Sequence, residues 1–116
     1  VYRVQGAAAR IERDLLLARR YAQATSSSRT VTFTESTNKY VLVGIADPDR
    51  SNDTYEVELS RTGYPATLVW IDLGGTDSVT FDQYGKPNVS GTVVVESGEH
   101  ERTVTVDAVT GKASVN

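Results

Sequence analysis

The first 25 residues carry apolar side chains at intervals of three and four residues, which is the period of an amphipathic α-helix. Residues 5–24 are rich in Ala, Leu, Arg and Gln, which all favour helix. The polar run Thr25-Ser26-Ser27-Ser28 indicates where the helix ends. The sequence therefore predicts one long helix over residues 1–25, with a single apolar stripe facing a core. The stripe consists of Val4, Ala8, Ile11, Leu15, Ala18 and Ala22.

From residue 30 onward the apolar positions alternate with a period of two, which is typical of β-strands. Clusters of Gly, Pro, Asn, Asp and Ser separate the alternating stretches and predict turns. One helix followed by strands indicates an α+β fold with one or two antiparallel sheets. We expect a single domain, 1–116, with the helix at 1–25 and a β domain at 30–116. The expected strands are 30–34, 39–45, 55–59, 66–73, 78–82, 92–96 and 102–107.

Two features of the helix are not explained by packing against the core of this domain. Its first turn contains no Ser, Thr, Asp or Asn to cap it, so we expect the helix to continue upstream of Val1. Leu16 and Leu17 lie off the apolar stripe, on either side of Arg13 and Arg20. Two interpretations remain open. In the first, these leucines are ordinary, partly exposed surface residues. In the second, they form an interface with a neighbouring subunit together with the two arginines.

Composition narrows the classes of function. The chain has no Cys and one His, His100, so disulfides, thiolate metal sites and multi-histidine metal sites are excluded. The formal net charge is −3, which is not the footprint of a general nucleic-acid-binding domain. The charge is uneven, because residues 1–25 hold five arginines against two acidic residues. No apolar run approaches the ~20 residues that span a bilayer.

Three stretches together resemble a known family. Asp14–Ala22 (DLLLARRYA), followed by Val31-Thr32-Phe33, resembles the family's helix end and first strand. Val79–Pro87 (VTFDQYGKP) is similar to its I-T-F-x-x-x-G-x-P segment, and Thr103–Lys112 (TVTVDAVTGK) to its closing strand, turn glycine and basic residue. The family comprises the minor pseudopilins of the type II secretion H class and the related minor type IV pilins of the FimT/FimU type.

This resemblance implies a pilin-like fold and a structural role without catalysis. In the family a membrane-spanning N-terminal helix continues into a second half that packs on a β domain, and residues 1–25 correspond to that second half. The implied partners are other pilin or pseudopilin subunits, the membrane through the missing N-terminal helix, and secreted cargo. The implied location is the bacterial inner membrane and periplasm, or the cell surface in a pilus, with the subunit near the filament tip.

The resemblance also raises an alternative, a DNA-binding or adhesin-like surface module of a pilus. Some FimT-like members take up DNA and carry two arginines after the turn glycine of the C-terminal strand. Here the matching residues are Gly111-Lys112-Ala113-Ser114, with Lys112 as the one basic residue. DNA affinity sums over several phosphate contacts. The sequence therefore favours protein partners over DNA, with Lys112 as the candidate nucleic-acid residue of the alternative.

A second pattern, independent of the family, lies between residues 47 and 58. Oxygen donors occupy the first, third, fifth, seventh and twelfth places, which is the spacing of a calcium-binding loop of the EF-hand type. However, Asn52 replaces the expected Gly. The residues on both sides are predicted to form strands, so a helix–loop–helix is excluded. Two readings remain, a β-loop calcium site or a polar hairpin loop. The candidate calcium ligands are Asp47, Asp49, Ser51, Asp53 and Glu58.

The sequence shows no catalytic constellation. His100 lies in an acidic hairpin segment, and no nucleophile-elbow pattern surrounds any Ser. Gly74-Gly75 lacks the spacing of a phosphate-binding loop. We therefore expect no enzymatic activity and no cofactor, apart from the calcium alternative.

Overall fold

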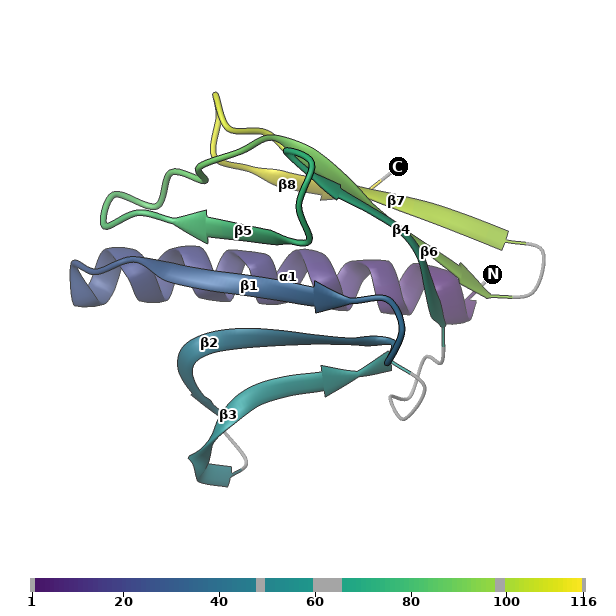
Figure 1. Cartoon of the computed structure of the whole chain (residues 1–116), viewed down its shortest axis with the longest axis horizontal. Helices are drawn as coiled ribbons and strands as arrows, with labels where there is room; N and C mark the ends of the chain where they lie inside the picture. The colour runs from purple at the N-terminus through teal and green to yellow at the C-terminus, as the bar shows by residue number, and fades with distance from the viewer. Residues whose placement is uncertain (1, 48–49, 60–65, 98–99, 116) are drawn as a thin grey trace.

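A computed structural model describes residues 2–47, 50–59, 66–97 and 100–115. The helix packs against two four-stranded sheets, ordered β3-β2-β1-β5 and β4-β6-β7-β8, with every described pairing antiparallel (Figure 1). This confirms the predicted α+β fold. The elements are α1 (Tyr2–Thr25), β1 (Arg29–Thr34), β2 (Lys39–Asp47), β3 (Arg50–Glu58), β4 (Thr67–Leu73), β5 (Ser78–Phe81), β6 (Gly91–Ser97), β7 (His100–Val106) and β8 (Ala113–Val115).

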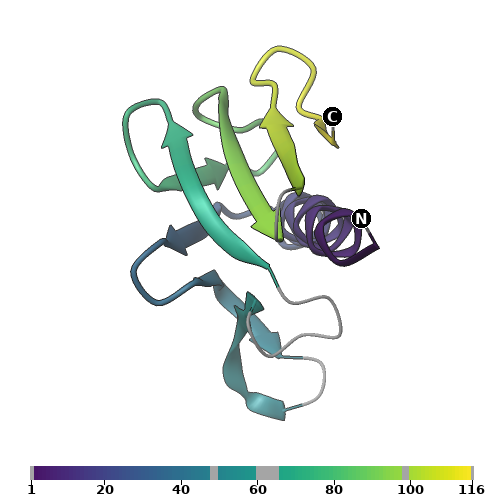
Figure 2. The ribbon, with the colours of Figure 1, turned by 90° about the vertical axis from the view of Figure 1, so that its right-hand side faces the viewer.

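Helix α1 runs along nearly the whole length of the molecule and packs against both sheets. Its 24 residues give a length of about 36 Å, nearly the molecule's longest dimension of 40 Å. It contacts strands of both sheets, and the end-on view shows it lying along one side of them (Figure 2). The predicted stripe is buried wherever its side chains are described, at Ala8, Ile11, Leu15, Ala18 and Ala22.

The end of α1 is fixed by a motif that works without glycine. Ser26 adopts a left-handed conformation with φ of 51°. This turns the chain so that the backbone N–H of Ser27 donates to the carbonyl of Ala22, and that of Ser26 to the carbonyl of Gln23. These are the two hydrogen bonds of a Schellman motif. The predicted helix end after Thr25 is therefore confirmed.

Most strand boundaries lie within two residues of the predictions, and two elements, β3 and β8, differ by more. Strand β3 starts at Arg50, five residues earlier than expected, because polar residues 50–54 form a strand without apolar alternation as they pair with β2. That pairing contains two register shifts, next to Gly44 with φ of 80°. Strand β8 was not predicted, because three residues are too few to show a period. Its pairing with β7 holds it in place.

Candidate assembly surface

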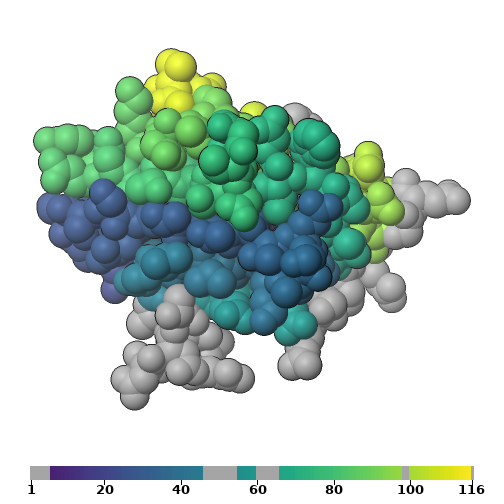
Figure 3. Space-filling model, viewed as in Figure 1, coloured from purple at the N-terminus to yellow at the C-terminus, as the bar shows by residue number. Residues whose placement is uncertain are grey.

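One side of α1 is left uncovered by both sheets. On the face shown in Figure 3 the sheets cover α1. The exposed positions Ala9, Arg13, Leu16 and Arg20 fall within about 60° of one another around the helix. We call these four residues the outer helix face. Leu16 is 39% exposed and is flanked by two arginines, so this face combines an apolar centre with cationic edges.

The structure separates the four residues of the predicted interface. Arg13, Leu16 and Arg20 come together on the outer helix face. Leu17, by contrast, is partly buried and packs against the hydrophobic core. The sequence pattern could not distinguish the two leucines, because both lie outside the main stripe, on opposite sides of the helix's exposed arc.

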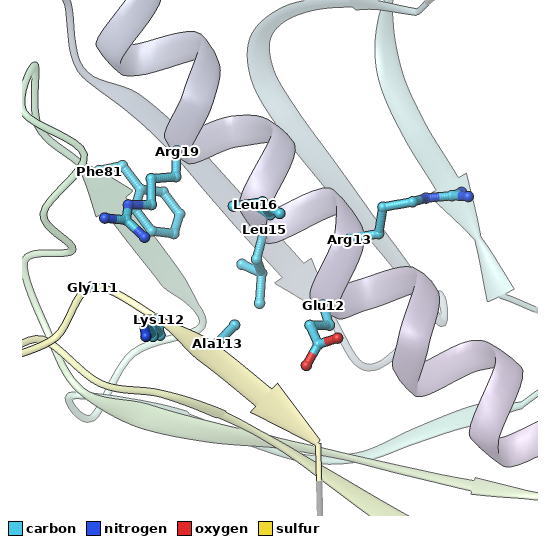
Figure 4. A pocket seen from close by; sticks show the side chains of 9 residues that line it. All are labelled: Glu12, Arg13, Leu15, Leu16, Arg19, Phe81, Gly111, Lys112 and Ala113. Carbon is cyan, nitrogen blue, oxygen red and sulfur yellow. The ribbon is translucent and has the colours of Figure 1, made fainter.

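Next to the outer helix face lies a groove of about 540 Å³ between α1, the end of β5 and the start of β8. We call it the helix groove. Its lining is apolar at Leu15, Leu16, Phe81 and Ala113. Lys112, the candidate nucleic-acid residue, lines this groove rather than an isolated turn. Figure 4 shows Arg19 and Lys112 on the same side of it, Glu12 farther along, and Arg13 pointing away.

Two turns of similar design pack near the C-terminal part of α1, and the second of them lines the groove at Gly111. In each, an aspartate carboxylate accepts backbone N–H groups of the turn: Asp82 from Tyr84 and Lys86, Asp107 from Val109 and Thr110. Each turn ends in a left-handed glycine whose N–H donates to the same aspartate's carbonyl. The glycines are Gly85 and Gly111, the turn glycines of the family-like motifs.

These glycines let the turns approach the C-terminal part of α1 closely. A Cβ on Gly85 would lie 2.6 Å from Nε2 of Gln23 and 3.0 Å from Cγ of Arg19. Gln23 uses that Nε2 to donate to the carbonyl of Tyr84 at 2.9 Å. The second turn packs on the same arginine, because a Cβ on Gly111 would lie 3.4 Å from Cζ of Arg19.

Substitution of Gly85 tests this close approach. Gly75 provides a matched control, because its φ is also 84° but a Cβ there meets no atom within 4 Å. We expect Gly75→Ala to cost about 1–2 kcal/mol of the free energy of unfolding from backbone strain. Gly85→Ala should cost about 0.5–1.5 kcal/mol more, because the end of the Gln23 side chain must move and lose its hydrogen bond to the Tyr84 carbonyl. Urea unfolding followed by circular dichroism measures both, and equal losses would show that the turn is not packed on α1.

A buried polar cluster joins α1 to the sheet of β1, β2, β3 and β5. Asp14 is 1% exposed and accepts hydrogen bonds from the hydroxyls of Tyr40 at 2.5 Å and Tyr55 at 3.0 Å. The guanidinium of Arg10, one turn earlier, lies 3.6 Å from the Asp14 carboxylate. Arg10 also donates to the Tyr55 hydroxyl at 3.4 Å. A carboxylate buried in this way needs all of these partners.

Burial, together with the negative charge of Asp14, raises the pKa of both Tyr40 and Tyr55 above the usual value for tyrosine. Both hydroxyls therefore stay protonated at neutral pH and serve as donors to Asp14. The sequence motif that contains Asp14 does not indicate this role. The signal was ambiguous, because Glu12 and Asp14 flank the apolar stripe at equal angles, and only the positions of Tyr40 and Tyr55 show which carboxylate is buried.

The other candidate sites are only partly covered by the structure. Of the calcium pattern, Asp49 and the side chains of Asp47, Ser51 and Asp53 lie outside the described residues. The backbone forms a hairpin in which Asp47 pairs with Arg50, and Glu58 lies at the far end of β3. Five residues of strand separate Glu58 from Asp53 by up to about 16 Å, so Glu58 is remote from the hairpin turn. Calcium binding stays a prediction.

Within the described residues, no cluster of three or more His, Cys, Asp or Glu side chains could hold a metal ion. His100 is exposed at the start of β7, where it pairs with Ser97.

Comparisons with known proteins agree with this architecture. A family model described as Type II transport protein GspH matches residues 7–111. Two crystal structures of the type IV minor pilin FimU from Pseudomonas aeruginosa strain PAO1 superpose on the chain with TM-scores of 0.71 and 0.66, each at 13% identity. Each covers 97% of this chain, and the matches span 87% and 91% of the FimU chains. Among curated proteins no sequence matches this chain.

Proposed function

The chain belongs to the GspH family of type II transport proteins, and we propose that its outer helix face contacts other pilin-type subunits in the filament. It is a structural minor subunit of the pseudopilin and minor-pilin class. The family match spans both α1 and the β domain, and the fold agrees with that of the minor pilin FimU. The proposal therefore concerns which surface assembles and with what.

The observation that carries the proposal is the uncovered side of α1. A helix that lies along the whole domain would be expected to show polar residues on its solvent side. Here Leu16 lies there, 39% exposed, between Arg13 and Arg20. Apolar centres with arginine at the edge are typical of protein interfaces. A neighbouring helix or β domain would bury Leu16 and leave the arginines at the rim.

The family also supports a location at the bacterial inner membrane and in the periplasm, or on the surface of a pilus. In this proposal an apolar N-terminal helix attaches the subunit to the membrane before assembly. A place near the filament tip, contact with secreted cargo, and the DNA-binding alternative remain predictions. Among the described residues, no helix is long and apolar enough to cross a membrane.

Filament fractionation tests whether the subunit enters filaments, and Leu16→Asp in the same assay tests whether it does so through the outer helix face. The full-length protein is expressed in its native host with the other pilin subunits, the filaments are sheared off, and each fraction is immunoblotted. We expect the subunit in the filament fraction together with the other pilins, and in the membrane fraction when the assembly machinery is deleted. A subunit that is found in soluble fractions under both conditions would contradict the proposal.

A further inference from the structure

The helix groove combines an apolar lining with positively charged side chains. Leu15, Phe81 and Ala113 provide an apolar floor. Two cations, Arg19 and Lys112, stand together on one side, as Figure 4 shows. They come from α1 and from the turn before β8, so the fold brings them together from positions 93 residues apart in sequence. The groove therefore pairs an apolar surface with a local positive charge.

Neither cation is neutralised within the part of the chain that the structure describes. No carboxylate there forms an ion pair with Arg19 or Lys112. The Nε atom of Arg19 is buried and has no hydrogen-bond acceptor. Because this Nε is closed off from solvent, an acceptor from outside would reach the terminal nitrogens of the Arg19 guanidinium, which form charge-assisted hydrogen bonds with carboxylates. The packing of Gly111 against the guanidinium holds Arg19 in position for such a ligand.

The chemistry of the groove favours a protein segment as the occupant. A nucleic acid is bound by many phosphate contacts along a basic surface. Here two cations stand beside an apolar floor and Glu12 lies farther along the groove, so the positive charge is confined to one point and does not follow a backbone. An apolar side chain next to a single carboxylate matches both the floor and the charge.

We propose that the helix groove binds a segment of a neighbouring pilin-type subunit in which an apolar side chain adjoins an Asp or Glu, with Arg19 and Lys112 pairing with that carboxylate. This inference rests on the proposed function and names the chemistry of one contact within it. The groove adjoins the outer helix face and shares Leu16 with it, but Arg13 points away from the groove.

Zero-length carbodiimide cross-linking of sheared filaments tests the carboxylate directly, because it joins a lysine amine to a carboxylate in contact with it. Lys39 and Glu56, which form an ion pair at 3.0 Å, provide the internal positive control. We expect mass spectrometry to find Lys112 joined to an Asp or Glu of another pilin subunit. If the Lys39–Glu56 cross-link forms while Lys112 is unmodified or is joined to its own chain, for example to Glu12, the inference is wrong.

Charge reversal provides the second arm of the test. In filaments, Lys112→Glu should lower incorporation of the full-length subunit by about tenfold or more. Lys86→Glu, an equally exposed lysine in the other turn, should leave it within about twofold. Lys112→Gln, with folding checked by circular dichroism, should show an intermediate loss.

The outcomes separate this inference from the proposed function. If wild-type protein enters filaments and Lys112→Glu enters equally well, the groove inference fails and the proposed function stands. If wild-type protein never enters filaments, the proposed function fails and the inference fails with it. Binding of duplex DNA that is lost in Lys112→Glu, together with normal filament incorporation, would assign the groove to nucleic acid and overturn the inference.

Discussion

Asp14→Ala should destabilise the domain by about 2–4 kcal/mol, because it removes the one carboxylate that accepts hydrogen bonds from two tyrosine hydroxyls. The hydroxyls of Tyr40 and Tyr55 both donate to this carboxylate, and Arg10 lies beside it. With Asp14 removed, the largely buried Tyr40 hydroxyl loses its acceptor in an apolar environment. Domains of this size are stable by about 5–15 kcal/mol, so the loss is a large fraction of the total.

Single tyrosine substitutions separate the parts of this cluster. Tyr40→Phe should cost about 1–2 kcal/mol, since Asp14 then keeps its contacts with Tyr55 and Arg10. Tyr55→Phe should cost less than Asp14→Ala for the same reason. Denaturant unfolding of the three variants measures the free energies. A loss for Asp14→Ala no larger than that for Tyr40→Phe would show that the carboxylate does not hold α1 to the sheet.

Leu16→Asp should leave the isolated domain folded and reduce incorporation into filaments by roughly tenfold or more, because the interface would then bury a carboxylate where it now buries a leucine. Leu16 is 39% exposed, so the free domain tolerates a polar side chain there. Leu17→Asp provides an informative contrast. Leu17 packs against the core, so that substitution should lower the melting temperature of the isolated domain.

The control for Leu16→Asp is Val43→Asp. Val43 is 48% exposed on β2, away from α1, and is similar in exposure and in the charge that the substitution introduces. We expect Val43→Asp to enter filaments as the wild type does. Equal losses in both variants would indicate a general effect of added negative charge rather than an interface at Leu16.

The sequence predicted the elements in which apolar positions repeat with the period of a helix or a strand. The stripe of α1 and the alternating strands β1, β4, β6 and β7 appear at or within two residues of the expected positions, because helix and strand periods follow from which face is buried. The start of β3 and all of β8 could not be predicted. Both depend on pairing with a neighbouring strand and not on a local apolar pattern.

The candidate surface was predictable only in part. Arg13, Leu16 and Arg20 could be placed on one side of a helix from their spacing. The partial burial of Leu17 depends on where the sheets lie, which no periodicity gives. The approach of Arg19 and Lys112 on one side of the helix groove depends on the turn at Gly111, which brings residues distant in sequence together.

Site-specific photo-cross-linking in assembled filaments tests the central claim most directly. A photoreactive amino acid is placed at position 16 on the outer helix face, or at position 43 on β2, in the full-length protein in its native host. We expect position 16 to cross-link to another pilin subunit and position 43 not to do so. Cross-links to a pilin subunit from position 43 with none from position 16 would contradict the claim that this subunit assembles through α1.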